Sequence, residues 1–266
     1  MHGEKRLLGP FLRKGYGVRG ALAGLLAVAA VVVSGCADQP RSGERITVYA
    51  AASLQASFTE LAGIFEARNP GIDVELSFAG SSDLAAQLIA GASADVFASA
   101  NEANMQKVVD AGLVASDPVD FAANVLTIIT APGNPEGISS LADLTDPSLL
   151  VVTCAPQVPC GAAAQAAASQ AGVTLSPLSE ESSVAGVLAK VSSGQADAGL
   201  VYVTDARAVG DRVSAVAFPE AARAVNTYPV ALLGLAGESP AARKFVELLT
   251  SQDGQRVMAE AGFRVP

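Results

Sequence analysis

One stretch decides the fold of this chain: Ile46-Thr-Val-Tyr-Ala-Ala-Ala-Ser-Leu54. Its apolar first half is typical of a buried strand, and the apolar residues that follow Ser53 recur at helical spacing as far as Phe65. This change of period places Ser53 at a helix N-terminus. The first N–H groups of a helix lack intrahelical partners, and the helix dipole puts partial positive charge there. The sequence therefore predicts an anion-binding turn at Ser53.

The same unit of strand, small-residue turn and helix recurs along the chain. The strand at Ile72–Phe78 leads into a turn with Ser81 and Ser82, and the strand at Ala94–Ala98 leads into a turn with Ala100. Later turns of the same kind contain Cys160, Val184 and Tyr202. Strands that alternate with helices predict an α/β fold in which each sheet is mainly parallel and is flanked by helices.

The pattern breaks twice, and we interpret each break as a crossover between two lobes. It lapses between residues 118 and 124, and a return connection is predicted before residue 226. Lobe 1 is therefore predicted to comprise residues 45–123 and 226–266, and lobe 2 residues 124–225. The crossovers near Ala123 and Ala224 are expected to act as hinges.

The N-terminal 44 residues have the pattern of an export signal and a tether. A basic region precedes an apolar run at Ala21–Val33, which is too short to cross a bilayer. Residues 1–35 resemble a bacterial lipoprotein signal peptide, which implies that Cys36 is lipidated and that residues 36–44 form a polar tether. The alternative is an ordinary signal peptide that is cleaved nearby.

Charge and composition exclude several classes of function. Without residues 1–35, the chain keeps 12 basic and 25 acidic residues, a net charge of −13. This charge argues against nucleic acid or an anionic membrane surface as a partner. The only histidine is His2, inside the predicted signal. A Ser-His-Asp or Cys-His catalytic group and a His-ligated metal are therefore excluded from the mature chain.

Two cysteines remain after Cys36, in the segment Cys154-Ala-Pro-Gln-Val-Pro-Cys160. Outside the cytoplasm such a pair favours a disulfide. The alternative, a structural zinc site, needs more ligands than two thiolates. We expect a Cys154–Cys160 bond whose main role is to hold the shape of a loop.

The predicted turns share one chemical property, which is that they offer neutral hydrogen-bond donors and contain no lysine or arginine. The carboxyl ends of strands in open α/β sheets are where ligands bind, so these turns are expected to meet at one cleft. Neutral donors suit a fully deprotonated oxyanion, which accepts many hydrogen bonds and has no proton to give. The candidate oxyanion-binding residues are Ser53, Ser81, Ser82, Ala100, Cys160, Val184 and Tyr202.

Four segments of the chain resemble a known family, the periplasmic molybdate-binding proteins of ABC importers. They are Val-Tyr-Ala-Ala-Ala-Ser-Leu (48–54), Phe-Ala-Gly-Ser-Ser-Asp-Leu (78–84), Gly-Ala-Ser-Ala-Asp-Val-Phe-Ala-Ser-Ala (91–100) and Gly-Leu-Val-Tyr (199–202). The resemblance covers nearly all of residues 45–266. It implies a two-lobed, type II-like periplasmic binding fold with the ligand cleft between the lobes.

The resemblance also implies roles for individual residues. Ser53 and Ser81 would donate hydrogen bonds through hydroxyl and N–H, Ala100 and Val184 through N–H, and Tyr202 through its phenol. Cys160 departs from the family, which usually has a small residue such as alanine there, but a contact through the backbone N–H tolerates this change.

What the resemblance implies for function is a monomeric, extracytoplasmic, lipid-anchored receptor. It would bind molybdate or tungstate, with molybdenum held as an oxyanion and with no metal cation or cofactor, and deliver it to ABC permease subunits in the membrane. It would not be an enzyme.

Three alternatives stay open at this point. Ser53, Ser81 and Ser82 are also suited to simple helix caps. A receptor of the same architecture for sulfate or phosphate would have the same turns, and the size of the cavity cannot be read from a sequence. An enzyme with Ser53 or Cys160 as nucleophile is a third interpretation, but it lacks a histidine base, and no lysine lies beside the turns.

Overall fold

The computed structural model describes residues 43–234 and 239–266. The predicted signal peptide (residues 1–35), Cys36 and all of the tether except its last two residues lie outside the described part. Within the described residues, no helix is both long enough and apolar enough to cross a membrane.

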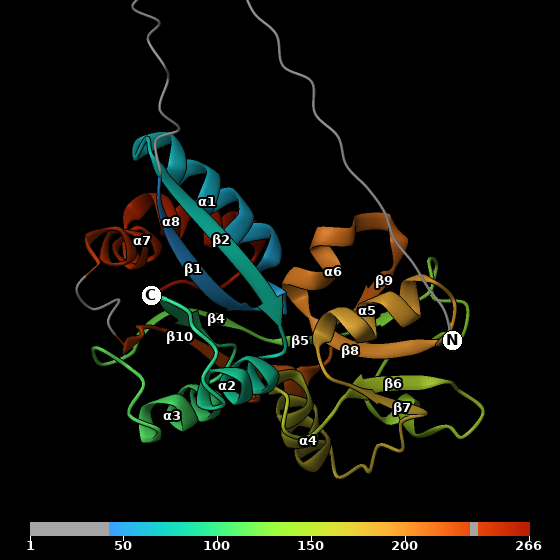
Figure 1. Cartoon of the computed structure of the whole chain (residues 1–266). Helices are drawn as coiled ribbons and strands as arrows, with labels where there is room; N and C mark the ends of the chain where they lie inside the picture. The colour runs from blue at the N-terminus through green and yellow to red at the C-terminus, as the bar shows by residue number, and fades with distance from the viewer. Residues whose placement is uncertain (1–42, 235–238) are drawn as a thin grey trace, which may run out of the picture. The chain divides into compact units, whose positions relative to one another are not determined.

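The first sheet has five strands in the order β2-β1-β3-β10-β4 (Figure 1). Strand β1 pairs in parallel with β2 and β3, whereas β10 is antiparallel to both β3 and β4. Residues Ile46, Val48 and Ala50 of the opening stretch alternate into the core, as expected for a half-buried strand. The strands are β1 (Glu44–Ala51), β2 (Ile72–Ala79), β3 (Val96–Ala98), β4 (Val119–Asn124) and β10 (Asn226–Leu232).

The second sheet also has five strands, in the order β7-β6-β8-β5-β9. Strand β6 pairs in parallel with β7 and β8, and β5 is antiparallel to β8 and β9. The strands are β5 (Leu126–Thr130), β6 (Val151–Cys154), β7 (Ser179–Glu181), β8 (Ala198–Tyr202) and β9 (Ser214–Val216).

Among the described residues, four strands of each sheet run in one direction and one strand runs against them, so the sheets are mixed but mainly parallel, as predicted. The antiparallel strands are β5 and β10, and each arrives directly from the other lobe. Only Val125 separates β4 from β5. A parallel neighbour needs a long crossover that returns the chain to the same end of the sheet. A strand that enters from the opposite lobe starts at the other end and therefore runs antiparallel.

Helices cover both faces of each sheet. Figure 1 shows α1, α7 and α8 on one face of the first sheet and α2 and α3 on the other, and it shows α4 on the opposite side of the second sheet from α5 and α6. The helices are α1 (Gln55–Arg68), α2 (Ser81–Ile89), α3 (Glu102–Asp110), α4 (Pro159–Ala171), α5 (Val184–Ser192), α6 (Val203–Val209), α7 (Pro240–Thr250) and α8 (Gln252–Ala261), with short 3-10 turns at η1 (Ala52–Leu54), η2 (Ala142–Thr145), η3 (Gly210–Arg212) and η4 (Pro219–Arg223).

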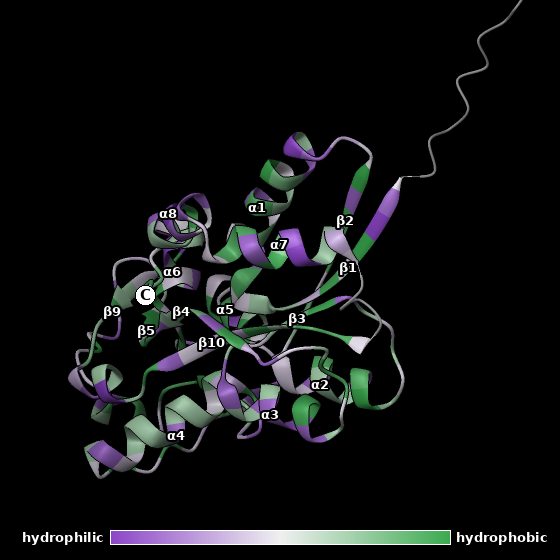
Figure 2. Ribbon diagram, turned by 90° about the vertical axis from the view of Figure 1, so that its left-hand side faces the viewer, coloured by the Kyte–Doolittle hydropathy of each residue, from purple (hydrophilic) through white to green (hydrophobic). Residues whose placement is uncertain are grey.

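The start of α7 follows the sequence signal closely. Ser239 is its N-cap, and the Ser239 hydroxyl accepts a hydrogen bond from the Ala242 N–H at 3.2 Å, with Pro240 at the first helical position. Hydrophilic and hydrophobic residues alternate along α7 (Figure 2), as expected for a helix with one buried face.

An aromatic cluster anchors the core of the first lobe. Phe58 of α1 is fully buried, and its ring centroid lies 5.8 Å from that of Phe121 on β4 and 6.1 Å from that of Phe245 on α7. These are ordinary separations for tilted and edge-to-face aromatic pairs. Phe58 therefore joins one helix to a strand and to a second helix that is distant in the sequence.

Replacing this ring should destabilise the protein strongly. We expect Phe58→Ala to lower the free energy of unfolding by about 3 to 5 kcal/mol, because it removes buried contacts and leaves a cavity. Urea unfolding followed by circular dichroism measures the loss. Ile89→Ala is the matched control, since Ile89 is 51% exposed, and it should change the free energy by less than about 1 kcal/mol. Similar losses for both variants would contradict the packing described.

Candidate functional site

A small cavity lies where the ends of strands and the beginnings of helices from both lobes meet. Its empty volume is about 200 Å³. The cavity is lined by Ala51, Ala52, Ser53, Gly80, Ser81, Ala100, Val158, Pro159, Cys160, Val184 and Tyr202.

Six of the seven residues predicted as oxyanion ligands line this cavity; the exception is Ser82. The Ser82 hydroxyl is buried and has no hydrogen-bond partner among the described residues. Neither Ser53 nor Ser81 caps a helix through its hydroxyl, so the simple capping role considered above is not what the structure shows. Their role as ligands of an anion stays a prediction.

Ser53 lies in the 3-10 turn η1, just before α1, and is held there by Tyr228 of β10. Its hydroxyl oxygen is 2.9 Å from the Tyr228 hydroxyl. Burial raises the pKa of Tyr228, so that phenol stays protonated and is able to donate. When Tyr228 donates to Ser53, the Ser53 proton is free to point into the cavity. No local signal identifies Tyr228, because the contact joins residues that are distant in the sequence.

Ser81 begins α2, and its hydroxyl accepts a hydrogen bond from the Ala100 N–H at 2.9 Å. This bond leaves the Ser81 proton available to a guest in the cavity. It also means that the Ala100 amide already has an acceptor. A contact between the Ala100 N–H and an anion, as the resemblance implies, would require this bond to be shared or exchanged.

Tyr202 ends β8 and supplies the most exceptional polar group of the cavity. The residue is 1% exposed, and its hydroxyl has no hydrogen-bond partner among the described residues. Burial raises the pKa of Tyr202, so the phenol is a donor and not an anion. Leaving a buried hydroxyl unpaired costs about 1 to 3 kcal/mol. A ligand that accepts this hydrogen bond removes the cost.

The predicted disulfide between Cys154 and Cys160 is present, with the Cα atoms 5.7 Å apart. It ties the end of β6 to the first turn of α4. The side chains of Cys160 and Val184 bring no strong donor, so any hydrogen bond to a guest must come from backbone N–H groups. Neither α4 nor α5 has a side-chain hydrogen bond at its N-cap, and both N-terminal turns face the cavity.

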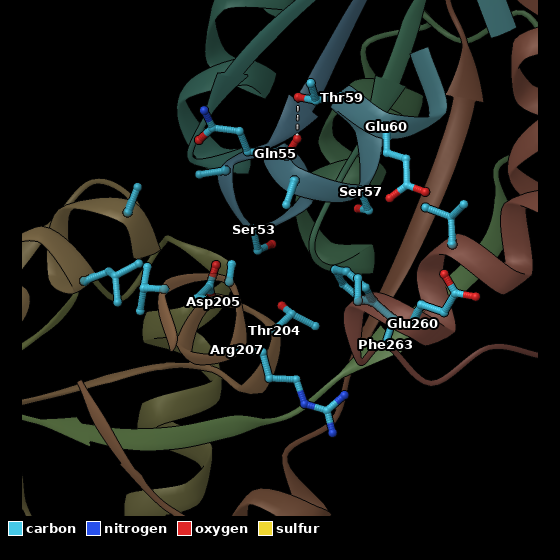
Figure 3. Close-up of a pocket in the computed structure, with 18 of the residues that line it drawn as sticks. Ser53, Gln55, Ser57, Thr59, Glu60, Thr204, Asp205, Arg207, Glu260 and Phe263 are labelled. Atoms are coloured by element: carbon cyan, nitrogen blue, oxygen red, sulfur yellow. Dashed lines mark hydrogen bonds between the residues drawn. The ribbon is translucent and has the colours of Figure 1, made fainter. Parts of the chain in front are cut away.

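Among the described residues that line the cavity there is no lysine or arginine. A larger groove, with an empty volume of about 1610 Å³, adjoins it and shares Ala52 and Ser53 (Figure 3). That groove carries charges of both signs, from Glu60, Arg207, Arg212 and Glu260. In the part of the chain that the structure describes, no three His, Cys, Asp or Glu side chains lie close enough together to hold a metal ion.

Asp205 is a buried acidic group three residues after Tyr202. It lies in the first turn of α6, is 8% exposed, and accepts a hydrogen bond from the Tyr202 N–H at 3.0 Å. Burial raises its pKa to about 7, and the Tyr202 hydrogen bond only partly offsets this effect. A carboxyl group that is about half protonated at pH 7 repels an anion less than a fully ionised one does.

Two mixed sheets with a cavity between them define a two-lobed solute-binding fold. The family described as bacterial extracellular solute-binding protein matches residues 46–264, and the chain belongs to this family. It is 49% identical over 246 residues to the molybdate-binding protein ModA of Mycobacterium tuberculosis (strain ATCC 25618 / H37Rv), covering 92% of this chain and 94% of that protein.

Solved structures show the same fold. The periplasmic molybdate-binding protein of Azotobacter vinelandii is 22% identical with a TM-score of 0.71, covering 83% of this chain and 99% of that one. The sulfate-binding protein SubI of Mycobacterium tuberculosis H37Rv is 23% identical with a TM-score of 0.69, covering 84% of this chain and 87% of that one. The two-lobed α/β fold predicted from the sequence is therefore confirmed.

The buried carboxyl of Asp205 gives a testable dependence of stability on pH. Its folded pKa of about 7 lies above the ordinary value of 3.8. Between these values the folded state holds a proton that the unfolded state has lost, so stability falls as pH rises from about 4 to 7 and then levels off. The loss is about 1.4 kcal/mol for each pH unit across that window.

Asp205→Asn keeps an acceptor for the Tyr202 N–H and has no proton to lose. Thermal melts of both proteins at several pH values between 4 and 8 measure the effect. We expect the melting temperature of Asp205→Asn relative to that of the natural chain to increase steadily across this window. A difference that stays constant with pH would show that Asp205 is ionised throughout.

Proposed function

We propose that this chain captures molybdate outside the cytoplasm and delivers it to the permease of an ABC importer. One observation carries the proposal: a cavity between two lobes, lined by hydroxyl groups and the first turns of helices, with no lysine or arginine among its described lining residues. The identity to a molybdate-binding protein over most of the chain supports the choice of ligand.

The chemistry of the cavity favours a fully deprotonated anion. Ser81 and Tyr202 each have a hydroxyl proton that is free to point into the cavity, and Ser53 has one when Tyr228 donates to it. The described lining residues include no carboxylate, so they offer no side-chain acceptor of that kind for the proton of a partly protonated anion such as hydrogen phosphate. Helix N-termini supply partial positive charge without a side-chain cation.

The size of the cavity supports a compact tetrahedral anion. Its empty volume of about 200 Å³ lies below the roughly 300 to 1,000 Å³ of pockets that hold drug-sized ligands, which favours a small anion over a sugar or a peptide. Sulfate is the second candidate, because SubI, a sulfate-binding protein, shares the fold. Tungstate has the same charge and geometry as molybdate and is proposed as a further ligand.

The remaining parts of the proposal concern location and motion. The receptor would be attached to the membrane by a lipid at Cys36 and would act as a monomer without enzymatic activity. Residues 45–123 with 226–266 and residues 124–225 would move as two lobes about hinges near Ala123 and Ala224. The position of the cavity between the two sheets supports this division.

A ligand panel tests the proposal directly. A ligand that binds only the folded state raises the melting temperature by an amount that grows with its concentration relative to Kd. Melts of the mature protein with molybdate, tungstate, sulfate or phosphate should show protection by molybdate and tungstate at micromolar concentration. Protection by sulfate and not by molybdate would establish the second candidate instead.

The two serines give a test at the level of residues. Replacing both with alanine, Ser53→Ala with Ser81→Ala, removes two hydroxyl donors to a charged guest. We expect a loss of about 2 to 5 kcal/mol of binding free energy for molybdate, measured by isothermal titration calorimetry. Ser148→Ala is the control, because its hydroxyl is exposed and bonds to Asp146. Unchanged affinity in the double variant would place the site elsewhere.

A further inference from the structure

Gly80 makes a contact that no other residue type could make. A Cβ atom built on Gly80 would overlap the carbonyl oxygen of Ser182, and it would lie 3.2 Å from the carbonyl carbon of Ser182 and 3.7 Å from the Cα of Ser183. All three neighbours are backbone atoms, which cannot rotate away as a flexible side chain does. The Gly80 backbone is therefore in direct contact with the Ser182 backbone.

The local conformation does not explain why this residue is glycine. Gly80 is the N-cap of α2, with φ −62° and ψ 138°. Any L-residue adopts this extended geometry without strain. The need for a missing side chain therefore comes from the neighbour and not from the turn itself.

The contact joins the two lobes at the wall of the cavity. Gly80 follows β2 of the first sheet, whereas Ser182 follows β7 of the second sheet and lies two residues before α5. Gly80 itself lines the cavity, as do Ser81, one residue after Gly80, and Val184, two residues after Ser182. The separation of these two walls is thus set where the two backbones meet.

Two hydrogen bonds across the cleft involve side chains and are more adaptable. The amide of Asn104 on α3 donates to the Gln157 carbonyl at 3.3 Å, and that of Asn226 on β10 reaches the Pro159 carbonyl at 3.5 Å. Both are made by side chains that are able to rotate or lengthen their bonds. The contact between Gly80 and Ser182 joins backbone to backbone, so no side chain is able to rotate and relieve a clash there.

We infer that Gly80 is a positioning residue that sets how closely the lobes approach and hence the width of the anion cavity. The inference rests on the proposed function and deepens it. Donors from both lobes reach one small anion only when each lies within about 2.7 to 3.2 Å of it. A methyl group at Gly80 holds the walls apart, so donors of one lobe lose contact while each lobe remains folded.

The test compares Gly80→Ala with Gly63→Ala. Gly63 lies in α1, and a methyl group added there would meet no other part of the described chain within 4 Å, so it controls for the change from glycine to alanine. Isothermal titration calorimetry with sodium molybdate should give a Kd for Gly80→Ala that is raised at least about tenfold, the effect of breaking one hydrogen bond to a charged ligand. Gly63→Ala should bind like the natural chain.

Two further readouts separate positioning from a defect in folding. The ligand-free melting temperature of Gly80→Ala should stay within about 4 °C of the natural value, since open lobes accommodate the methyl group. Small-angle scattering should show that molybdate reduces the radius of gyration of the natural chain more than that of Gly80→Ala. Gly80→Val should weaken binding further than Gly80→Ala.

The outcomes are distinguishable. Equal affinity and equal contraction for Gly80→Ala and the natural chain would overturn the inference and leave the proposed function intact. A ligand-free Gly80→Ala protein that fails to fold would also overturn it, because the clash would then lie within one lobe. Failure of the natural chain and of Gly63→Ala to bind molybdate would instead overturn the proposed function, and the inference with it.

Discussion

Neutral groups must compensate the charge of any anion held in this cavity, and most features of the site follow from that constraint. Peptide N–H groups and hydroxyls are weak partners in water, where the solvent competes for them. They become strong partners when they are desolvated and already oriented. The cavity meets this condition through its size and through lining residues that are mostly small or apolar, so that donors from both sheets are brought close together.

Orientation of the donors depends on a second set of residues, which lie behind the cavity wall. Tyr228 holds the Ser53 hydroxyl, and the Ala100 N–H holds that of Ser81. In each case the partner directs which way the serine proton points. Asp205 fixes the backbone of Tyr202 without adding a full negative charge, because its burial favours the protonated form. The hydroxyls of Ser53 and Ser81 therefore each have a hydrogen-bond partner in the protein. The Tyr202 hydroxyl has no such partner within the described chain.

The sequence predicts those parts of this arrangement that depend on local pattern. The turn at Ser53 is predictable because the apolar period changes there, and the disulfide is predictable because two cysteines lie six residues apart in an export context. The direction of β5 and β10 is not predictable in this way, because it is decided by pairing with strands that are distant in the sequence.

The pair Ser81 and Ser82 shows where local reasoning reaches its limit. Successive residues of a helix point about 100° apart, so only one of two adjacent serines at a helix start can face a given cavity. The sequence places both at the turn, and the tertiary structure selects Ser81. The choice depends on how α2 is rotated against the first sheet, where Leu84, Ala85 and Leu88 are buried.

The disulfide also helps to hold the donors of the cavity in place before a ligand binds. The loop that it closes carries Val158, Pro159 and Cys160 of the cavity wall, and the Gln157 and Pro159 carbonyls that receive Asn104 and Asn226 from the first lobe. A cross-link over so short a loop removes only about 2 kcal/mol of chain entropy. Its larger effect is to hold the loop in one backbone conformation. That conformation forms the cavity wall and also presents the carbonyls that contact the first lobe. Less ordering is then left to be done when a ligand binds, and affinity depends on how little ordering remains.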